Sequence, residues 1–309
     1  ELYIKCGDYD SALKILADAP EDDFIFSLEG KCWLEKFLKY GNKEYISNAI
    51  TYFLAAIKAL RKKKIKNPEK VHERDFHSHY YDLGESYRLA GQTEEAIKAF
   101  ENLENEPFED ANAIHQIARI YMARGAENLN LKDYELAIVK YFLSIEKNDI
   151  LNNASNFNDI GNIIFDIYKY IEKKNEEPPM YCNFKIEFTN RCNKFLNDTA
   201  GYPNSMKENF TKLQQHVSES LQRIDLLYIA ENFFYLSKKL NDDDDYASRK
   251  LGEIYESLYN ENKEIDFINK ALIAYNHARY AFFQKNYTDD EGIVQKIKRL
   301  CGPKSNDHE

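Results

Sequence analysis

The chain has 309 residues, of which 43% are hydrophobic and 30% charged, and its formal net charge is −10. It has no apolar stretch of the roughly 18 or more residues that span a bilayer, so we expect no membrane insertion. Its acidity disfavours general nucleic-acid binding, because phosphates are repelled. The five cysteines form no CxxC pair, which argues against a disulfide framework or a zinc site and predicts a reduced, cytoplasmic protein.

Apolar residues recur at helical spacing along most of the chain, and strand-like alternation is nowhere sustained. The sequence therefore predicts an all-α fold. The first residues, Glu1 to Lys5, show neither an initiating Met nor a signal-peptide pattern. We interpret them as the cut end of a longer protein. The range 8–19 is then expected to be the second helix of a pair whose first helix is mostly missing.

A pattern of small residues begins at Gly30, which precedes Ala49 by 19 residues. An aromatic residue, Trp33, follows the first small residue by three, and another, Phe53, follows the second by four. This predicts two helices that cross where the small residues lie. The basic run 61–66 comes next. We interpret it as a helix C-terminus, where cations complement the dipole, although a patch for an anionic partner stays open.

The clearest unit spans residues 76–108. Its first helix carries an apolar stripe, its second begins after a turn at 91–93, and a proline opens the next element. The stripe residues are Tyr80, Leu83, Gly84 and Tyr87, then Ala96, Phe100 and Leu103, with Pro107 at the end. Three histidines, His72, His77 and His79, crowd its start. We predict a solvated helix start there and no metal site, because a fourth ligand with defined geometry is not evident.

The offset of 19 residues recurs twice, between Ala118 and Ala137 and between Gly252 and Ala271. The flanking aromatic residues recur with it: Tyr121, Tyr141, Tyr255 and Tyr275. Compared with the 76–108 unit, these units contain about seven more residues, or two helical turns. We therefore expect longer helix pairs in these places.

The 76–108 unit resembles the tetratricopeptide repeat (TPR), with Tyr80 at the usual Trp position and Pro107 one place early. The resemblance implies a right-handed superhelical solenoid of about six or seven antiparallel helix pairs. The longer units resemble variant repeats of multidomain signalling proteins, including bacterial fusions of TPR arrays to caspase-like proteases. We identify no protease domain in this chain.

Breaks in the helical pattern suggest four regions. We predict N-terminal repeats over 1–174, an irregular insertion or bend over 175–205, C-terminal repeats with a capping helix over 206–300, and a flexible tail over 301–309. Prolines 178, 179 and 203 mark the insertion because they interrupt helices. Four aspartates, 242–245, precede the helix of Gly252 and are expected to complement its N-terminus rather than to bind calcium.

In TPR arrays the first helix of each pair lines the concave face, which implies a binding surface on this chain. Its candidate partner-binding residues, placed by their offsets from Gly84, Ala118 and Gly161, are Tyr81, Glu85, Arg88, Asn112, His115, Arg119, Asn158 and Asn162. The alternative is an ordinary solvated helix face. The family's clamp for chaperone tails uses a Lys and Asn pair, which Tyr81 and Glu85 do not supply, so we do not predict that clamp.

The sequence thus favours a scaffold that binds a protein or peptide of unknown identity. The alternative is a regulatory or sensor module of a larger signalling or defence protein, controlling an attached or partner enzyme such as a caspase-like protease. A self-contained enzyme is disfavoured, because no phosphate loop, nucleophile elbow or HExxH motif occurs. We predict no cofactor, and the sequence does not indicate an oligomeric state.

Overall fold

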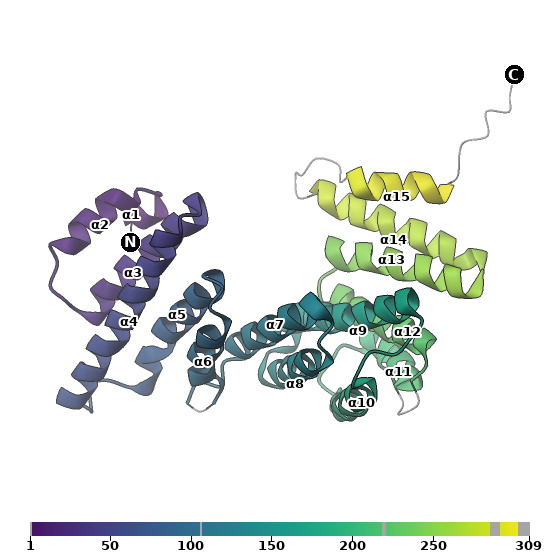
Figure 1. Cartoon of the computed structure of the whole chain (residues 1–309), viewed down its shortest axis with the longest axis horizontal. Coiled ribbons are helices and arrows are strands. Elements are labelled where there is room, and N and C mark those ends of the chain that lie inside the picture. Colours follow the sequence, from purple (N-terminus) through teal and green to yellow (C-terminus); the bar gives the residue numbers. More distant parts are fainter. Residues whose placement is uncertain (1, 106, 218–220, 285–290, 302–309) are drawn as a thin grey trace, which may run out of the picture. The chain divides into compact units, whose positions relative to one another are not determined.

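The computed structural model of the chain describes every residue except 1, 106, 218–220, 285–290 and 302–309. Helices follow one another throughout the described residues, and no strand occurs among them (Figure 1). The all-α prediction is therefore confirmed. No described helix is long and apolar enough to cross a membrane. The predicted tail lies outside the described residues, apart from Cys301, which ends the last helix.

The chain divides into two compact units, Glu1–Ile120 and Tyr121–Glu309, with the division inside α7. Unit 1 contains a short pair, two full pairs and the start of α7. Its elements are α1 (Leu2–Lys5), α2 (Tyr9–Ala17), α3 (Asp23–Tyr40), α4 (Lys43–Lys66), the 3-10 turn η1 (Glu73–Phe76), α5 (His77–Leu89), α6 (Thr93–Glu104) and α7 (Ala111–Asn128). Helix α3 packs on α4 and α5 on α6, while α4 also packs on α5.

Unit 2 continues with three pairs, one of which is interrupted by an insertion. Its elements are α8 (Leu131–Lys147), η2 (Ile150–Asn153), α9 (Ala154–Lys174), α10 (Tyr181–Asn197), η3 (Asn204–Met206), α11 (Lys207–His216), α12 (Arg223–Leu240), α13 (Asp245–Asn262), α14 (Ile265–Gln284) and α15 (Glu291–Cys301). The pairs are α7/α8, α9/α12 and α13/α14, and α15 packs on α14. With α1/α2, the described residues hold six pairs, within the predicted range.

Helix ends follow from local chemistry, as the junction of α3 and α4 illustrates. Asp22 begins α3 by accepting a hydrogen bond from the backbone N–H of Phe24 at 3.0 Å. Gly41 ends it with φ of 71°, a conformation that glycine adopts without steric cost. Asn42 then accepts from the N–H of Glu44 at 2.9 Å and begins α4. Two residues therefore reverse the chain.

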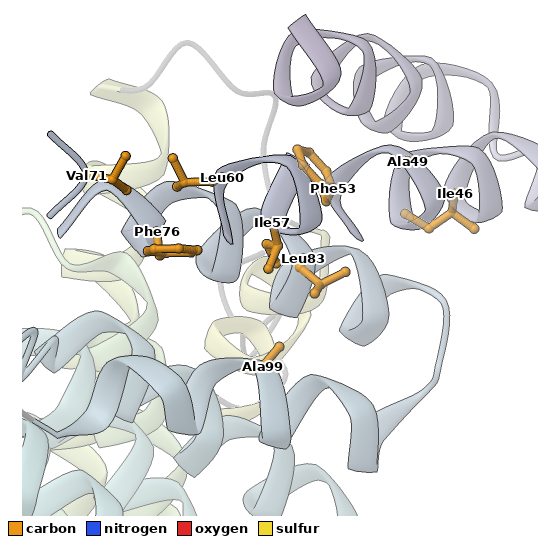
Figure 2. Close-up of a cluster of buried hydrophobic side chains, with 9 residues drawn as sticks. All are labelled: Ile46, Ala49, Phe53, Ile57, Leu60, Val71, Phe76, Leu83 and Ala99. Atoms are coloured by element: carbon orange, nitrogen blue, oxygen red, sulfur yellow. The ribbon is translucent and has the colours of Figure 1, made fainter. Parts of the chain in front are cut away.

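The core of unit 1 is a continuous set of apolar side chains from successive helices. Figure 2 shows Phe53, Ile57 and Leu60 of α4 near Leu83 of α5, with Ala99 of α6 following. Neither a single helix nor a single pair could bury these faces alone. Burial across pairs contributes roughly 1.5–3 kcal/mol for each large side chain and fixes the order in which the pairs pack.

The small residues recognised in the sequence lie where paired helices approach most closely. A Cβ atom added at Gly30 would lie 2.7 Å from the ring of Phe53. At Gly84 it would lie 2.7 Å from Phe100, and at Gly252 it would lie 2.5 Å from the ring of Tyr275. Each glycine thus accommodates an aromatic ring of the second helix, which explains the recurring offset between the small residue and the aromatic one.

The two classes of helix pair predicted from the offsets are confirmed. The pair α5/α6 has helices of 13 and 12 residues. The pairs with the 19-residue offset are longer: α3 and α4 have 18 and 24 residues, α7 and α8 have 18 and 17, and α13 and α14 have 18 and 20. The extra turns enlarge the surface that each of these pairs presents.

The predicted irregular range, 175–205, contains a regular 17-residue helix, α10. Helix α9 pairs with α12, and α10 packs mainly on α8, so the whole segment 175–222 is inserted between the two members of one pair. Aromatic rings attach the insertion. The ring centroid of Phe195 lies 5.8 Å from that of Phe157 and 5.7 Å from that of Phe210. Asn153 also donates a hydrogen bond to the hydroxyl of Tyr202 at 3.1 Å.

Candidate functional site

The first helices of unit 1 carry six of the eight predicted binding residues. Helix α5 supplies Tyr81, Glu85 and Arg88, and the unit 1 part of α7 supplies Asn112, His115 and Arg119, at helical spacings that place each trio on one face. We call these six residues the Tyr81 patch. The other two predicted residues, Asn158 and Asn162, belong to α9 in unit 2.

Helices α5 and α7 are joined within unit 1 by contacts beside the patch. The imidazole Nε2 of His77 lies 2.8 Å from Oδ2 of Asp110, just before α7. The ring of His77 also stacks on Tyr81, with centroids 6.4 Å apart. Burial raises the pKa of the Tyr81 phenol, and a hydrogen bond to Gln116 partly opposes this shift. Tyr81 therefore presents a neutral, half-buried ring between the two helices.

The charged members of the patch differ in their surroundings. Arg88 donates to both carboxylate oxygens of Glu85, and its Nη2 lies 2.7 Å from Oε2. This pair holds its charges in one geometry, and Glu85 raises the pKa of Arg88 further above its usual range. Asn112 and Arg119 are exposed, and His115 is half-buried. The two exposed side chains are accessible to an incoming partner.

In unit 2 the two predicted asparagines contact the next helix pair. Asn158 donates to Oδ2 of Asp244 at 2.7 Å, and Asn162 accepts from the hydroxyl of Tyr246 at 2.8 Å. Asp244 is also the N-cap of α13, where it accepts from the N–H of Ala247 at 2.9 Å. The acidic run 242–245 thus includes the residue that begins a helix, as expected. Asn158 and Asn162 have a packing role in addition to any role in binding.

A second hollow on unit 1, of about 500 Å³, was not among the sequence predictions. We call it the His79 groove and define it by residues of α3 and α5: Phe24, Ser27, Lys31, Ser78, His79 and Asp82. A neighbouring hollow shares Phe24, Ser78 and His79 and continues toward Lys63 at the end of α4. The groove therefore combines an aromatic ring, 56% exposed at Phe24, with buried polar atoms.

His79 corrects the expectation of a solvated helix start. Its side chain is only 7% exposed, whereas that of His77 is 43% exposed. Burial lowers the pKa of His79, with a smaller opposing effect of Asp23, whose Oδ2 lies 3.9 Å from Nε2. The sequence did contain a signal, because His79, Leu83 and Ser86 share one face of α5, and both other residues are buried.

Asp82, one turn along α5, is the other unusual group of the groove. Its Oδ2 lies 3.4 Å from Nζ of Lys31, but no described residue gives this atom a hydrogen bond. Burial raises the pKa of Asp82, and Lys31 opposes the shift. Nδ1 of His79 likewise has no hydrogen-bond partner in the described part of the chain. The groove thus contains two buried polar atoms whose hydrogen-bonding capacity is unused.

The basic run at the end of α4 forms ion pairs within unit 1. Lys63 contacts both Asp22 and Asp23, at 2.7 Å from Oδ2 of Asp22. Arg61 donates to the hydroxyl of Tyr80 at 2.8 Å. No group of three or more His, Cys, Asp or Glu side chains among the described residues is placed to hold a metal ion. We therefore base the site on hydrogen bonding and packing.

Comparisons with known proteins do not identify a family for this chain. No family model matches the chain, and no curated protein matches it. Among solved structures, the chain is similar to the crystal structure of the C-terminal part of a TPR repeat-containing protein from Cytophaga hutchinsonii. The two are 13% identical, with a TM-score of 0.41, over 96% of this chain and 97% of the other.

Proposed function

We propose that this chain is a scaffold that binds a protein or peptide partner on the first helices of its pairs. The supporting observation is the distribution of buried polar atoms that lack a hydrogen bond. Within the described residues such atoms occur on α3, α5, α7 and α9, at Asp23, Trp33, His79, Asp82, Gln116 and Asn158, although Asp23 is also ion-paired with Lys63. Apart from Tyr181 on the inserted α10, the second helices carry none in the described part.

This distribution means that the buried polar atoms of the first helices lack more hydrogen bonds than those of the second helices. A buried polar atom without a partner destabilises the fold by about 1–3 kcal/mol. A partner chain that supplies the missing donors and acceptors recovers part of that energy on binding. Second helices are packed for stability, whereas first helices retain unmet capacity, which favours binding there.

In unit 1 the Tyr81 patch is the proposed contact surface for such a partner. Tyr81 offers a rigid ring with a polar hydroxyl, and tyrosine is common at the centres of interfaces. Arg119 and Asn112 offer exposed donors for carboxylates and peptide groups. Asn158 and Asn162 stay in the proposal for unit 2, with the packing contacts noted above.

The proposal is tested by comparing variants in a capture experiment. The immobilised chain, the double variant Tyr81→Ala with Arg119→Glu, and the control Lys98→Glu are incubated with lysate. Lys98 is exposed on α6, a second helix. We expect partners retained by wild type and the control to be lost from the double variant. Equal retention by all three would contradict a role for the patch, provided that their melting temperatures agree.

A regulatory role toward an attached enzyme, such as a caspase-like protease, stays a prediction from the resemblance alone. It requires that partner binding change the activity of the neighbouring enzyme. The test is the activity of the longer protein with wild-type residues and with the same double variant. Unchanged activity while capture is lost would leave only the scaffold function.

A further inference from the structure

The His79 groove has features of a built site and not of a chance hollow. Its two unpaired acceptors, Nδ1 of His79 and Oδ2 of Asp82, come from positions i and i+3 of α5 and thus lie on one side of the helix. The side chain of His79 is only 7% exposed, so its ring is fixed by the surrounding packing. Both residues line the same hollow.

The tautomer of His79 determines what the groove can bind. The ring is neutral near pH 7, because burial lowers its pKa. Asp23 lies on the Nε2 side, 3.9 Å away, which favours the proton on that nitrogen. Nδ1 then carries a lone pair and accepts a hydrogen bond. Because Asp82 also accepts, the ligand has to donate at two neighbouring points.

Among the side chains of proteins, arginine fits this requirement best. Its planar guanidinium carries N–H groups that point in fixed, neighbouring directions and keeps its charge at any physiological pH. The exposed ring of Phe24 offers a surface on which its apolar stem and flat head can pack. The acidic chain, with a net charge of −10, also favours a basic partner.

Lys31 is the group that competes with such a ligand. Its Nζ lies 3.4 Å from Oδ2 of Asp82, too far for a good hydrogen bond, and its side chain is 43% exposed. Lys31 can therefore move into solvent when a better donor arrives. Glu35 on α3 and Lys5 on α1 line the same hollow and add one charge of each sign.

We propose that the His79 groove binds an arginine side chain of an extended partner peptide, with the guanidinium between Nδ1 of His79 and a carboxylate oxygen of Asp82. The inference rests on the proposed function, since it assigns a partner chemistry to one of the first-helix surfaces of unit 1. The His79 groove differs from the Tyr81 patch in position and in the charge of the ligand that it favours. The exposed charge of that patch, Arg119, favours acidic segments.

The test uses fluorescent heptapeptide pools in which the central residue is fixed and the others vary. One pool has arginine at the centre, a matched pool has citrulline, which keeps the shape without the charge, and a third has glutamate. Binding is measured by fluorescence anisotropy to the full chain. We expect the arginine pool to bind wild type at least about tenfold more tightly than the citrulline pool, or about 1.4 kcal/mol.

Two variants locate the binding. Asp82→Asn should abolish the preference for arginine over citrulline, whereas Arg119→Glu should leave it unchanged. Equal binding of the two pools to wild type, or a preference that survives Asp82→Asn, would overturn the inference. Preference for the glutamate pool that disappears in Arg119→Glu would overturn it too, but would support the proposed function. Absence of binding by all three pools would count against both.

A measurement on the wild-type chain keeps the test valid if Asp82→Asn fails to fold. The ring nitrogens of His79 are followed by nitrogen NMR while the arginine pool is added. We expect the Nδ1 resonance to move as it accepts a hydrogen bond, and to move more than the Nε2 resonance. The same shift should require at least a tenfold higher concentration of the citrulline pool. An unchanged Nδ1 resonance at saturating arginine pool would overturn the inference.

Discussion

The pairs α3/α4 and α9/α12 use the same packing with very different connections. In α3/α4 only Gly41 and Asn42 separate the helices, and Gly30 accommodates the ring of Phe53. In α9/α12 the segment 175–222 intervenes, yet Gly161 lies against the ring of Phe234, 3.0 Å from its hypothetical Cβ. The comparison indicates that contact between a small residue and an aromatic ring, more than loop length, determines which helices pair.

The largest effect is expected from removing the ring in either pair. Phe53→Ala and Phe234→Ala each delete a side chain with 0% exposure. We expect each to destabilise its unit by about 3–5 kcal/mol, as is usual for buried phenylalanine. Urea unfolding with hydrogen exchange in α4 and α12 measures the loss. A cost for Phe234→Ala far below that for Phe53→Ala would show that the insertion, and not the ring, holds α12 in place.

Replacing a glycine by alanine should change the stability of the two pairs differently. An alanine at a helical glycine position gains up to about 1 kcal/mol of helix propensity. At Gly30 the added Cβ would meet the Phe53 ring at 2.7 Å, so we expect Gly30→Ala to destabilise by about 1–3 kcal/mol net. At Gly161 the closest ring atom is 3.0 Å away, and the two effects nearly cancel.

Gly41→Ala is the control for these glycine changes. Nothing lies within 4 Å of the Cβ position at Gly41, so the alanine is strained only by the positive φ. The melting temperatures of the three variants measure how much each alanine destabilises the chain. A Gly161→Ala variant as unstable as Gly30→Ala would mean that the rings are equally confined in both pairs.

A smaller effect is expected where the insertion meets α9. Tyr202→Phe removes the hydroxyl that accepts from Nδ2 of Asn153 at 3.1 Å. Asn153 is fully buried, and its other acceptor, the carbonyl of Ile145, is 3.5 Å away. We expect a loss of about 0.5–1.5 kcal/mol in the free energy of unfolding. Increased hydrogen exchange in α10 and α11, with α9 and α12 unchanged, would show that the insertion is attached independently of the pair.

The smallest effects concern two glutamates, one in each pair. Burial raises the pKa of Glu29 on α3 and of Glu231 on α12, and the hydroxyl of Tyr255 partly opposes the shift at Glu231. A raised folded-state pKa means that the folded chain binds the proton more tightly than the unfolded chain. Stability from this source is therefore fully present below the unfolded pKa near 4.5 and is lost as pH rises through the folded pKa.

Glu29→Gln and Glu231→Gln remove this dependence. We expect each variant to gain melting temperature relative to wild type between pH 4 and pH 7, with the difference growing as pH rises. Glu264→Gln, exposed between α13 and α14, is the matched control. A difference that shrinks with rising pH would mean that the buried carboxylates are stabilised as ions in the folded chain.

Much of the fold could be predicted from the sequence because its causes are local. The spacing of Gly30, Ala49 and Phe53 specifies two helices, their approach and their length, whatever surrounds them. The Tyr81 patch was placed in the same way, by offsets along α5 and α7, although its role in binding stays a prediction. Helix N-caps such as Asp22 and Asp244 are also local, since one carboxylate satisfies an N–H two or three residues away.

Only the tertiary structure decided which helix pairs with α9 and what surrounds His79. Helical periodicity identifies the buried face of α10 but not the helix that covers it, because an inserted helix and a paired helix have the same pattern. The choice depends on aromatic contacts such as that of Phe157 on α9 with Phe233 on α12, between residues far apart in the chain. The unpaired acceptors of His79 and Asp82 arise likewise from the packing of α3 against α5, which withdraws them from water without supplying donors.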